Sequence, residues 1–535
     1  MQLTIGRTGV NRQIQGLVIG LLVLGLVWEL ASWIIAGSDQ ILIMFGLSMI
    51  VGAMFLFILS NWRIGVLLFL IWILFEDLIR KYMGNSMVIY FAKDFLVGVA
   101  YLSFYFAKRR RQVETFKIPF LVPLAIFFWF AVIQVFNTWS PSILYGVLGL
   151  KLYFYYAPLM FLGYAMMERP ADLERFLVVS ISAGIVIAGL GIAQSVLGVT
   201  FLTPDDLAPE LYNLTHTTRA SPITHSLSTV TSSVFVSSGR FSFYLIMIWV
   251  LAMGAQGYLL LGRRPGAKYG FLGIGVVTAA VMITGERTPF VFVLGSAVVM
   301  TAAFLWGAPW RWGQGHLLVK ALRRAFLIGA VGIILMATVF PAVFGDHWKF
   351  LSETLSFGGE GSQLENRSID YPTMNLILAF QHERWIEGYG TGVTSLGMQY
   401  VARLLDQPTP TIGVESGYGN LIVEMGILGP ILWIFWVSAL LWSAWKVVKQ
   451  LRQTIYFPMA FAIWWYAFIM LVLLMHFNLL AYQNFVNNAY LWLLIGILYR
   501  LPKLAQMPQP ISVLKRAHGI VPWRLAPDVR ATSAK

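Results

Sequence analysis

The sequence predicts an all-α protein that crosses a membrane many times, and three observations support this fold class. Of 535 residues, 58% are hydrophobic and only 12% are charged, and the mean hydropathy is +0.73, whereas soluble domains carry about 25% charged residues. Apolar blocks of about 17–25 residues recur along the whole chain, each long enough as a helix to cross a hydrocarbon core of about 30 Å. The blocks do not alternate between apolar and polar positions, which excludes a transmembrane β-barrel.

The apolar blocks, taken in order, predict a polytopic bundle of about 12–14 spans. The first block lacks a small-residue cleavage site and is followed almost at once by a second, so we expect a retained span and not a removed signal peptide. The third block is short, and only Gly285-Glu-Arg287 separates the ninth from the tenth. The expected spans are residues 15–36, 41–59, 64–75, 86–106, 118–136, 144–166, 174–198, 241–261, 269–284, 288–306, 325–343, 419–443, 457–475 and 486–500.

The basic residues between the blocks predict the orientation. If the N-terminus is cytoplasmic, most of the 38 Lys and Arg residues fall on that side of the membrane, among them Lys108-Arg-Arg-Arg111 and those of the tail. The net charge of +14 is then a consequence of topology, and we expect no nucleic-acid partner. Both termini are expected in the cytoplasm. Cysteine is absent, which excludes disulfides, thiolate metal sites and cysteine nucleophiles.

Two long polar connections fall on the outer side in this topology. Both mix aromatic residues, glycines and single charges without low complexity, and loops of such length are usually functional. We therefore divide the chain into N-terminal transmembrane helices (1–198), a first periplasmic loop (199–240), central transmembrane helices (241–344), a large periplasmic catalytic loop (345–418), C-terminal transmembrane helices (419–500) and a cytoplasmic basic tail (501–535).

The second outer loop is predicted to be partly helical. Asp370-Tyr-Pro372 is a helix start, because proline is tolerated in the first turn, and Gly388 is expected to end the helix. Arg367 lies just before this helix, and a guanidinium group beside a helix N-terminus is a natural anion site. Gly388-Tyr-Gly-Thr-Gly392 has no strand before it, so we interpret it as tight turns and not as a nucleotide-binding loop.

Arginines on the outer face are few, and their positions leave two interpretations open. Arg287, in a short turn between two spans, either contacts lipid at the membrane surface or clamps a phosphate there. Arg367 either pairs with Glu365 or Asp370 or binds the same anion. For Arg219 and Arg240 both interpretations are open. For Arg384, which is flanked by Glu383 and Glu387, a structural pair is favoured.

Glu415 directly precedes the twelfth expected span. Its carboxylate either complements the dipole of that helix or acts as a general base, because burial beside a membrane raises the proton affinity of a carboxylate. Ser416 and Tyr418 are placed to orient it or a substrate.

Charged residues inside spans are costly and usually functional. For Lys93, Asp94 and Lys151 we favour structural pairs between helices, although Lys151 is also placed to hold a lipid phosphate. His382 and His347 are isolated, and no HExxH motif occurs, so we expect no metal site and no cofactor. No phosphate-binding loop faces the cytoplasm, which argues against an ATP-driven machine.

Several motifs together resemble the O-antigen ligase and O-antigen polymerase superfamily of bacterial surface polysaccharide assembly. Thr284-Gly-Glu-Arg287 is similar to the family's Thr-Gly-Ser-Arg turn, and Asn366-Arg367 followed by Gly388-Tyr-Gly-Thr-Gly392 is similar to its Arg and Gly-x-Gly-x-Gly segment. Glu415-Ser-Gly-Tyr418 with Glu424-Met-Gly-Ile-Leu-Gly429 resembles its His-Asn-x-Tyr and Glu-x-Gly-Ile-Leu-Gly motifs. The segment Phe235 to Arg240 also resembles the family, so the likeness covers about residues 235–430.

This resemblance implies a GT-C-like membrane fold and a metal-independent, inverting glycosyltransferase of the bacterial inner membrane. The donor would be an oligosaccharide on undecaprenyl diphosphate, with Arg287 and Arg367 at the diphosphate and Glu415 activating the acceptor hydroxyl. We assign substrate binding to Arg240, Arg219, Arg384, His382, Tyr418 and Lys151.

The ligases have His at the position of Glu415, so we favour a polysaccharide polymerase over a ligase that transfers glycan to lipid A core. The expected span number is also above the family's usual twelve or so. Expected partners are membrane lipids and a chain-length regulator or other polysaccharide assembly proteins. A flippase or secondary transporter is the alternative from another class, motivated by Lys93, Asp94 and Lys151. Against it, the chain shows no internal repeat.

Overall fold

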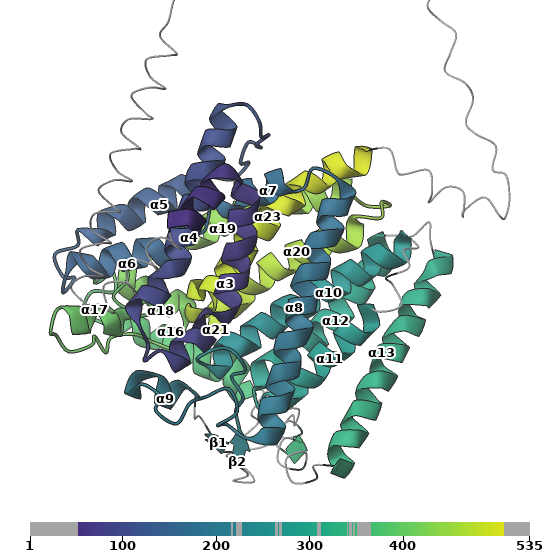
Figure 1. Ribbon diagram of the computed structural model, residues 1–535. Helices are drawn as coiled ribbons and strands as arrows, with labels where there is room; N and C mark the ends of the chain where they lie inside the picture. The colour runs from purple at the N-terminus through teal and green to yellow at the C-terminus, as the bar shows by residue number, and fades with distance from the viewer. Residues whose placement is uncertain are drawn as a thin grey trace, which may run out of the picture. The chain divides into compact units, whose positions relative to one another are not determined.

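The computed structural model describes residues 52–215, 218–220, 227–262, 270–307, 312–339 and 365–507, with a few isolated residues between these ranges. The expected span 15–36, most of 41–59 and the tail beyond residue 507 lie outside the described residues. Helices make up nearly all of the regular structure, as Figure 1 shows, beside one small hairpin. The prediction of an all-α fold is confirmed.

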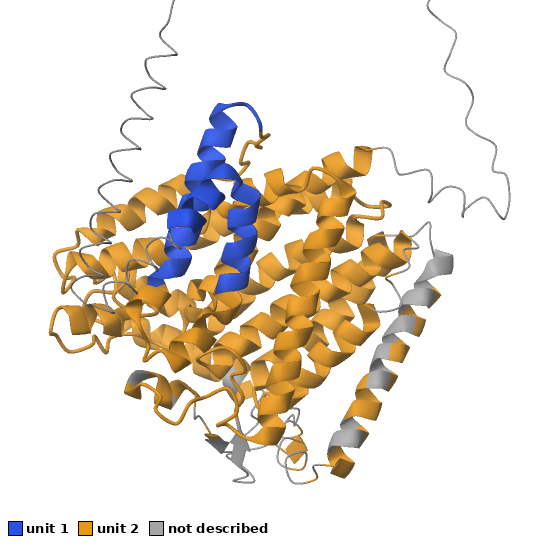
Figure 2. Cartoon of the chain, viewed as in Figure 1, with its two compact units in different colours: residues 1–72, 91–112 blue, residues 73–90, 113–535 orange. Residues whose placement is uncertain are grey.

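The chain forms two compact units, which Figure 2 colours separately. Unit 1 comprises Met1–Trp72 and Phe91–Gln112, and unit 2 comprises Ile73–Tyr90 and Val113–Lys535. The described part of unit 1 contains the start of α3 (Trp62–Tyr82) and most of α4 (Met87–Arg109). These segments pack through an edge-on contact between Trp62 and Phe104, whose ring centroids are 5.1 Å apart.

Within the described residues, 7 helical segments are long and apolar enough to span a membrane. The chain is therefore a polytopic helical membrane protein. Shorter apolar helices, such as α5 (Leu121–Val135) and α11 (Gly270–Ile283), lie between them. The 7 segments are Met87–Arg109, Ile143–Met166, Pro170–Leu197 (α8), Ser238–Leu261 (α10), Arg287–Gly307 (α12), Leu428–Gln450 (α19) and Phe457–Phe477.

Helix α10 is the central element of unit 2. It packs against α8, α11, α12 and α20 (Phe457–Phe468), and α13 (Trp312–Val339) lies beside α11 (Figure 1). The close approach of α8 to α10 requires small residues on α8. A Cβ on Gly184 would lie 2.5 Å from Ile248 of α10, and a Cβ on Gly191 would lie 2.4 Å from Phe241. Glycine at helix contacts is typical of membrane bundles, where packing and not the hydrophobic effect drives association.

Several expected single spans are interrupted in the structure. Residues 144–166 form α6 (Ile143–Phe154) and α7 (Leu159–Met166), and the expected span 419–443 forms α18 (Gly417–Met425) and α19. Gly426, with φ of +67°, causes the second break. The span at 457–475 is continuous but contains a π-helical turn, η4 (Ile469–Leu473), before α21 (Leu474–Phe477). Hydropathy does not detect breaks of two to four residues, because the residues on both sides remain apolar.

Helix α3 extends seven residues beyond the expected span 64–75, to Tyr82. This extension contains the charged residues Glu76, Asp77, Arg80 and Lys81, which lie beyond the predicted end of the span. All four are buried, with at most 1% of their surface exposed. Neighbouring opposite charges allow the helix to continue where the sequence suggested an end.

The two long polar connections, which the sequence predicts on the outer side, contain short elements of their own. The first holds α9 (Pro209–Thr215) and an antiparallel hairpin of β1 (Thr218–Ala220) and β2 (Leu227–Thr229). The second holds η3 (Asn366–Asp370), α16 (Tyr371–Phe380) and α17 (Met398–Leu404), and α22 (Leu480–Gln483) precedes the last helix, α23 (Phe485–Gln506). The expected helix at Asp370 thus exists, but it ends at Phe380 and not at Gly388.

Contacts in unit 2 join loops that the topology places on the same side. Arg500, near the end of α23, donates to Glu114 at 2.6 Å and to the carbonyl of Met167 at 2.9 Å, and all three were predicted on one side. Ser238 donates to Glu286 at 2.8 Å, and both were predicted on the other side.

The glycine-rich segment at residues 388–392 forms tight turns, as the sequence suggested. Gly388, Gly390 and Gly392 have φ of +81°, +104° and +87°, and a Cβ on Gly392 would lie 2.0 Å from the carbonyl oxygen of Tyr145. The backbone N–H groups of Tyr389 and Gly390 donate to carbonyls of α18 at 2.8 Å and 2.9 Å. The loop is thus attached to the helix that follows Glu415.

Glu424 on α18 holds this loop in place. Its carboxylate is fully buried and accepts hydrogen bonds from the Tyr153 hydroxyl at 2.8 Å and the Thr394 hydroxyl at 2.7 Å. A third bond, from the Thr394 backbone N–H, measures 3.2 Å. Glu424 therefore joins α6, α18 and the second outer loop.

We expect Glu424→Ala to lower the free energy of unfolding by about 2–4 kcal/mol, because several buried donors lose their acceptor. The measurement is thermal unfolding of the purified protein in detergent. Glu424→Gln keeps an acceptor oxygen and should cost less. Glu415→Ala removes an exposed carboxylate nine residues away and is the control; equal unfolding temperatures for all three variants would contradict the anchoring role.

Candidate functional site

Arg287 is the first residue of α12 and follows a tight turn. Gly285 adopts φ of +67°, and Glu286 is buried and accepts the hydrogen bond from Ser238, the first residue of α10. The turn is therefore fixed to the start of α10. Arg287 is half-buried, and the helix N-terminus of α12 begins at the same residue, a combination of groups that favours an anion.

Arg367 lies in the π-helical turn η3, which continues directly into α16. Its backbone is four residues before Tyr371, but its side chain lies outside the described part of the structure. The same holds for Arg219, whose backbone belongs to β1.

Glu415 contacts the helix that follows Arg367. Its carboxylate accepts a hydrogen bond from the Tyr371 hydroxyl at 2.9 Å, and its backbone N–H donates to the Asn375 side chain at 3.0 Å. The Asn375 amide in turn donates to the carbonyl of Tyr371 at 2.9 Å. Two residues of α16 thus orient the segment before α18. The Glu415 side chain is exposed, in contrast to the burial that we expected.

A histidine that the sequence analysis did not single out lies beside the same turn. His476, on α21, is half-buried, and its Nε2 lies 3.2 Å from the carbonyl oxygen of Ser368, the residue after Arg367. No motif marks His476, because it stands alone in an apolar segment. Only the fold brings it to the second outer loop.

Aromatic packing links this region to the helix of Arg287. Phe477, next to His476, meets Phe292 of α12 with ring centroids 6.2 Å apart. Phe292 is five residues after Arg287. The structure thus brings three segments together: the start of α12, the η3–α16 turn and the Glu415 segment.

Tyr418 and Ser416 do not orient Glu415. The Ser416 hydroxyl accepts from the Gly419 N–H at 3.2 Å and caps α18, and the Tyr418 hydroxyl lies 3.5 Å from the carbonyl oxygen of Val472. Burial raises the pKa of the Tyr418 hydroxyl. Tyr371 occupies the orienting position that we expected Ser416 or Tyr418 to take.

Arg240 is bound to a buried carboxylate of α3. One of its terminal nitrogens lies 2.7 Å from each oxygen of Asp77, and only 12% of the side chain is exposed. Asp77 also accepts from Arg80 at 3.2 Å and from the Val236 N–H at 3.3 Å. Arg240 therefore positions the start of α10 and shares its charge with Asp77.

The end of α3 is a cluster of interacting charges beyond residue 75, where the predicted span ends. Burial acts to raise the pKa of Asp77, but the positive charges of Arg240 and Arg80 outweigh it and hold that pKa below its usual value. Burial lowers the pKa of the Lys81 ammonium group to about 8, against the attraction of Asp77. Lys81 donates to the Ser233 carbonyl at 3.0 Å, which ties α3 to the end of the first outer loop.

Lys151 lies beside the same cluster. Its Nζ is 4.9 Å from the ring centroid of Tyr90, and the Arg80 guanidinium is 5.0 Å from the same ring. Arg80 also donates to the Tyr400 hydroxyl at 2.9 Å. One buried tyrosine ring therefore contacts two cations, as cation–π attraction allows.

Arg384 and His382 lie in the turns after α16. Arg384 pairs with Glu387 at 2.6 Å, and its guanidinium carbon lies 3.4 Å from the ring centroid of Trp139, which agrees with the structural interpretation. The ring of His382 meets that of Tyr389 at 6.0 Å. Among the described residues, no group of three or more His, Cys, Asp or Glu side chains is placed to hold a metal ion.

Comparison with known proteins gives no relative: no protein-family model, no curated protein and no solved structure matches the chain. The structure supports the class of the protein: it is a polytopic helical membrane protein with 7 candidate spans among its described residues. The function must therefore be argued from the residues themselves.

We expect Asp77→Ala to destabilise the protein by about 3–5 kcal/mol, because it leaves the buried Arg240 without its carboxylate and Arg80 with only the longer contact to Glu76, at 3.9 Å. Thermal unfolding in detergent measures the loss. Removing both charges of the pair, in Asp77→Leu with Arg240→Met, should recover part of it. A double variant that is less stable than Asp77→Ala would contradict this account.

Proposed function

We propose that the chain is a membrane glycosyltransferase that polymerises a surface polysaccharide from a donor on undecaprenyl diphosphate. The observation that carries the proposal is the hydrogen bond from Tyr371 to Glu415. It joins a carboxylate before α18 to the helix that begins after Arg367, and aromatic contacts join this region to the helix of Arg287. A carboxylate and two arginines are the groups that glycosyl transfer from a diphosphate requires.

The proposed reaction is a single inverting displacement. The acceptor hydroxyl attacks the anomeric carbon of the donor, the bond between that carbon and the phosphate oxygen breaks, and the diphosphate leaves with the electron pair. Glu415 takes the proton of the acceptor hydroxyl as the new glycosidic bond forms. The Tyr371 hydroxyl holds one carboxylate oxygen, so the other oxygen is directed to the acceptor.

Arg287 and Arg367 stabilise the negative charge that develops on the diphosphate. Arg287 acts together with the N-terminal N–H groups of α12, and fixed donors of this kind need no reorganisation during the reaction. Removing one such group typically slows a reaction about 10²–10³-fold. We propose no metal or other cofactor for this reaction.

The exposed apolar side chains of α16 support a lipid-borne donor. Met374 and Ile377 are 57% and 54% exposed, three residues apart on the helix that carries Tyr371. Exposed apolar residues at this spacing are typical of helices that lie at a membrane surface. We place the site on the periplasmic side of the bacterial inner membrane, with both termini cytoplasmic, and a tag-accessibility map of residues 365–418 tests this placement.

A polymerase is favoured over an O-antigen ligase because Glu415 stands where the ligases have His. Arg240 is bound by Asp77, so we assign it a positioning role at the start of α10. Arg219, Arg384, His382, Tyr418 and Lys151 remain candidates for sugar or phosphate contacts. A chain-length regulator or other assembly proteins are the proposed protein partners.

A flippase or secondary transporter is the second candidate, and the buried charges of α3 favour it. Glu76, Asp77, Arg80 and Lys81 are buried in one helix end, and such residues often mark transport pathways. The two candidates differ in an assay without a sealed membrane. Only the glycosyltransferase lengthens a lipid-linked oligosaccharide in detergent.

We expect Arg287→Ala and Arg367→Ala each to lower the rate of product formation about 10²–10³-fold, because each removes charge stabilisation from the leaving diphosphate. The assay uses purified protein in detergent, undecaprenyl diphosphate-linked oligosaccharide and a chelator. Arg403→Ala, which changes an exposed residue of α17, is the matched control and should retain wild-type activity. Full activity in both Arg287→Ala and Arg367→Ala would exclude the assigned site.

We expect Glu415→Gln to lower turnover about 10²–10⁴-fold with little change in donor binding, because the amide keeps the size of the side chain but accepts no proton. Tyr371→Phe removes one orienting hydrogen bond and should cost about fivefold. Rates and donor affinity are measured separately. Equal losses of affinity and turnover in Glu415→Gln would instead indicate a structural role.

A further inference from the structure

Helix α21, at the end of a membrane-spanning segment, contacts all three segments of the proposed reaction site. His476 lies 3.2 Å, through Nε2, from the carbonyl oxygen of Ser368 in η3. The carbonyl oxygen of Met475 would lie 2.4 Å from a Cβ on Gly417, the first residue of α18, so the two segments approach closely only because this residue is glycine. The ring contact of Phe477 with α12 is the third. A short helix without any charged residue except its histidine thus joins the site together.

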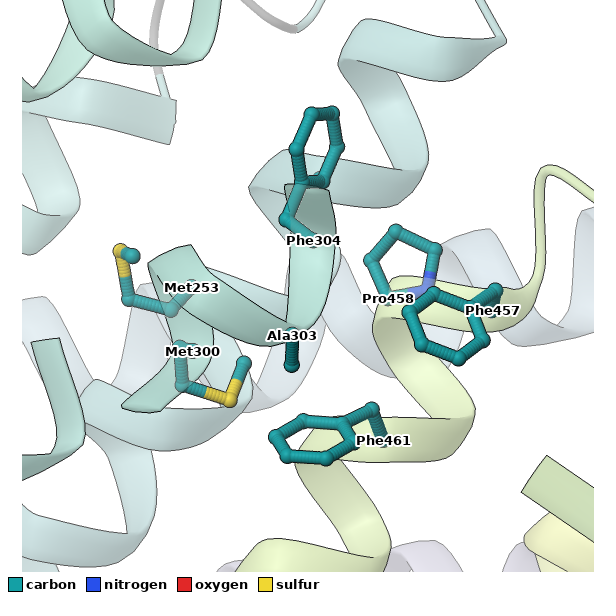
Figure 3. A pocket seen from close by; sticks show the side chains of 8 residues that line it. Met253, Met300, Ala303, Phe304, Phe457, Pro458 and Phe461 are labelled. Carbon is teal, nitrogen blue, oxygen red and sulfur yellow. The ribbon is translucent and has the colours of Figure 1, made fainter. Parts of the chain in front are cut away.

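The beginning of the same span is packed firmly against two neighbouring helices. Helix α20 lies against α10 and α12, and a Cβ on Gly257 of α10 would be 2.5 Å from Pro458. Figure 3 shows Pro458 and Phe461 of α20 opposite Ala303 of α12, around a small apolar pocket. These contacts fix α20, so the direction of the side chains on α21 depends on the segment between the two helices.

That segment is the π-helical turn η4. Such a turn inserts one residue and rotates the side chains that follow by about 100° relative to a regular α-helix. Within it, the Leu471 carbonyl accepts a hydrogen bond from the Trp433 indole at 3.1 Å, and the Val472 carbonyl lies 3.5 Å from the Tyr418 hydroxyl. Side chains of α19 and α18 therefore hold the irregular turn, and its rotation brings His476 to η3.

The contact between His476 and Ser368 has one possible direction. A carbonyl oxygen only accepts hydrogen bonds, so Nε2 carries the proton and donates. The neutral ring with its proton on Nε2 and the imidazolium both supply this donor, so the contact does not require a charged ring. Ser368 directly follows Arg367 in η3. The bond therefore holds the backbone beside Arg367.

We propose that His476 is a positioning residue that fixes η3, and with it the backbone of Arg367, to the end of the span. The bond joins two π-helical turns, since η3 carries Ser368 and η4 directs His476. Turns of this kind are frequent at functional sites. A guanidinium group stabilises developing charge best when it is held in place before the reaction. This role in the reaction rests on the proposed glycosyl transfer, whereas the anchoring of η3 does not.

The anchoring is tested by hydrogen exchange of the full-length protein in detergent. We expect His476→Leu to speed amide exchange at residues 366–371 about five- to tenfold, the effect of one lost hydrogen bond. His476→Gln, whose side-chain amide donates in place of Nε2, should exchange as the wild type does. His316→Leu makes the same change at an exposed position of α13 and is the matched control. Equal exchange in the wild type and a folded His476→Leu variant, or equal acceleration in both His476 variants, would overturn the proposal.

The role in transfer is tested by combining variants, because two residues that act as a unit have non-additive effects. His476→Leu should lower kcat/KM for the lipid-linked donor about five- to tenfold in the wild-type and Arg287→Ala backgrounds, but cause no further loss in Arg367→Ala. His476→Gln should restore the rate. An equal loss in the Arg367→Ala background would show that His476 does not act through Arg367. Wild-type protein that shows no transfer, with the exchange result as expected, would refute the glycosyltransferase and leave the anchoring in place.

Discussion

The ion pair between Asp77 and Arg240 is the contact on which the arrangement at this end of α3 and α10 depends. It fixes the end of α3 to the first turn of α10, and Lys81 fixes the same helix end to Ser232 and Ser233 of the first outer loop. Ser238, two residues before Arg240, then holds Glu286, so the position of Arg287 follows from this pair. A buried pair of this kind contributes more to a defined arrangement than to net stability, since desolvation offsets most of the attraction.

The positions of the helices were largely predictable, because an apolar span is specified by composition alone. From the third expected span onward, each has a helix in the structure, and where the boundaries differ the cause is local. Gly426 breaks a span with a positive φ that hydropathy does not record. Helix α3 continues past the predicted end of the span, and there Glu76 and Asp77 each pair with Arg80, at 3.9 Å and 3.2 Å. A sequence pattern identifies these residues as polar but does not show that they are paired.

The candidate site was predictable in part. Chain order indicated Arg287, Arg367 and Glu415. In the structure a series of contacts links their segments: Tyr371 with Glu415, Ser368 with His476, and Phe477 with Phe292 of α12. The contacts that connect them could not be read from sequence: Tyr371 is 44 residues from Glu415, and the His476 ring is 108 residues from Ser368. Arg240 is a different case. The sequence left it open as a substrate-binding residue, but in the structure it is paired with Asp77, 163 residues away. Long-range polar contacts depend on the tertiary fold, which no local pattern specifies.

The exposure of Glu415 places a requirement on the proposed reaction. Electrostatic stabilisation by arginines is strong only where water is excluded, and an exposed carboxylate faces solvent before substrate arrives. The proposed lipid-linked donor would supply the exclusion itself, because its chain would cover the apolar face of α16 as its diphosphate meets Arg287 and Arg367. On this view the site is complete only with substrate bound, so Tyr371 has the task of keeping the carboxylate oriented while the site is open.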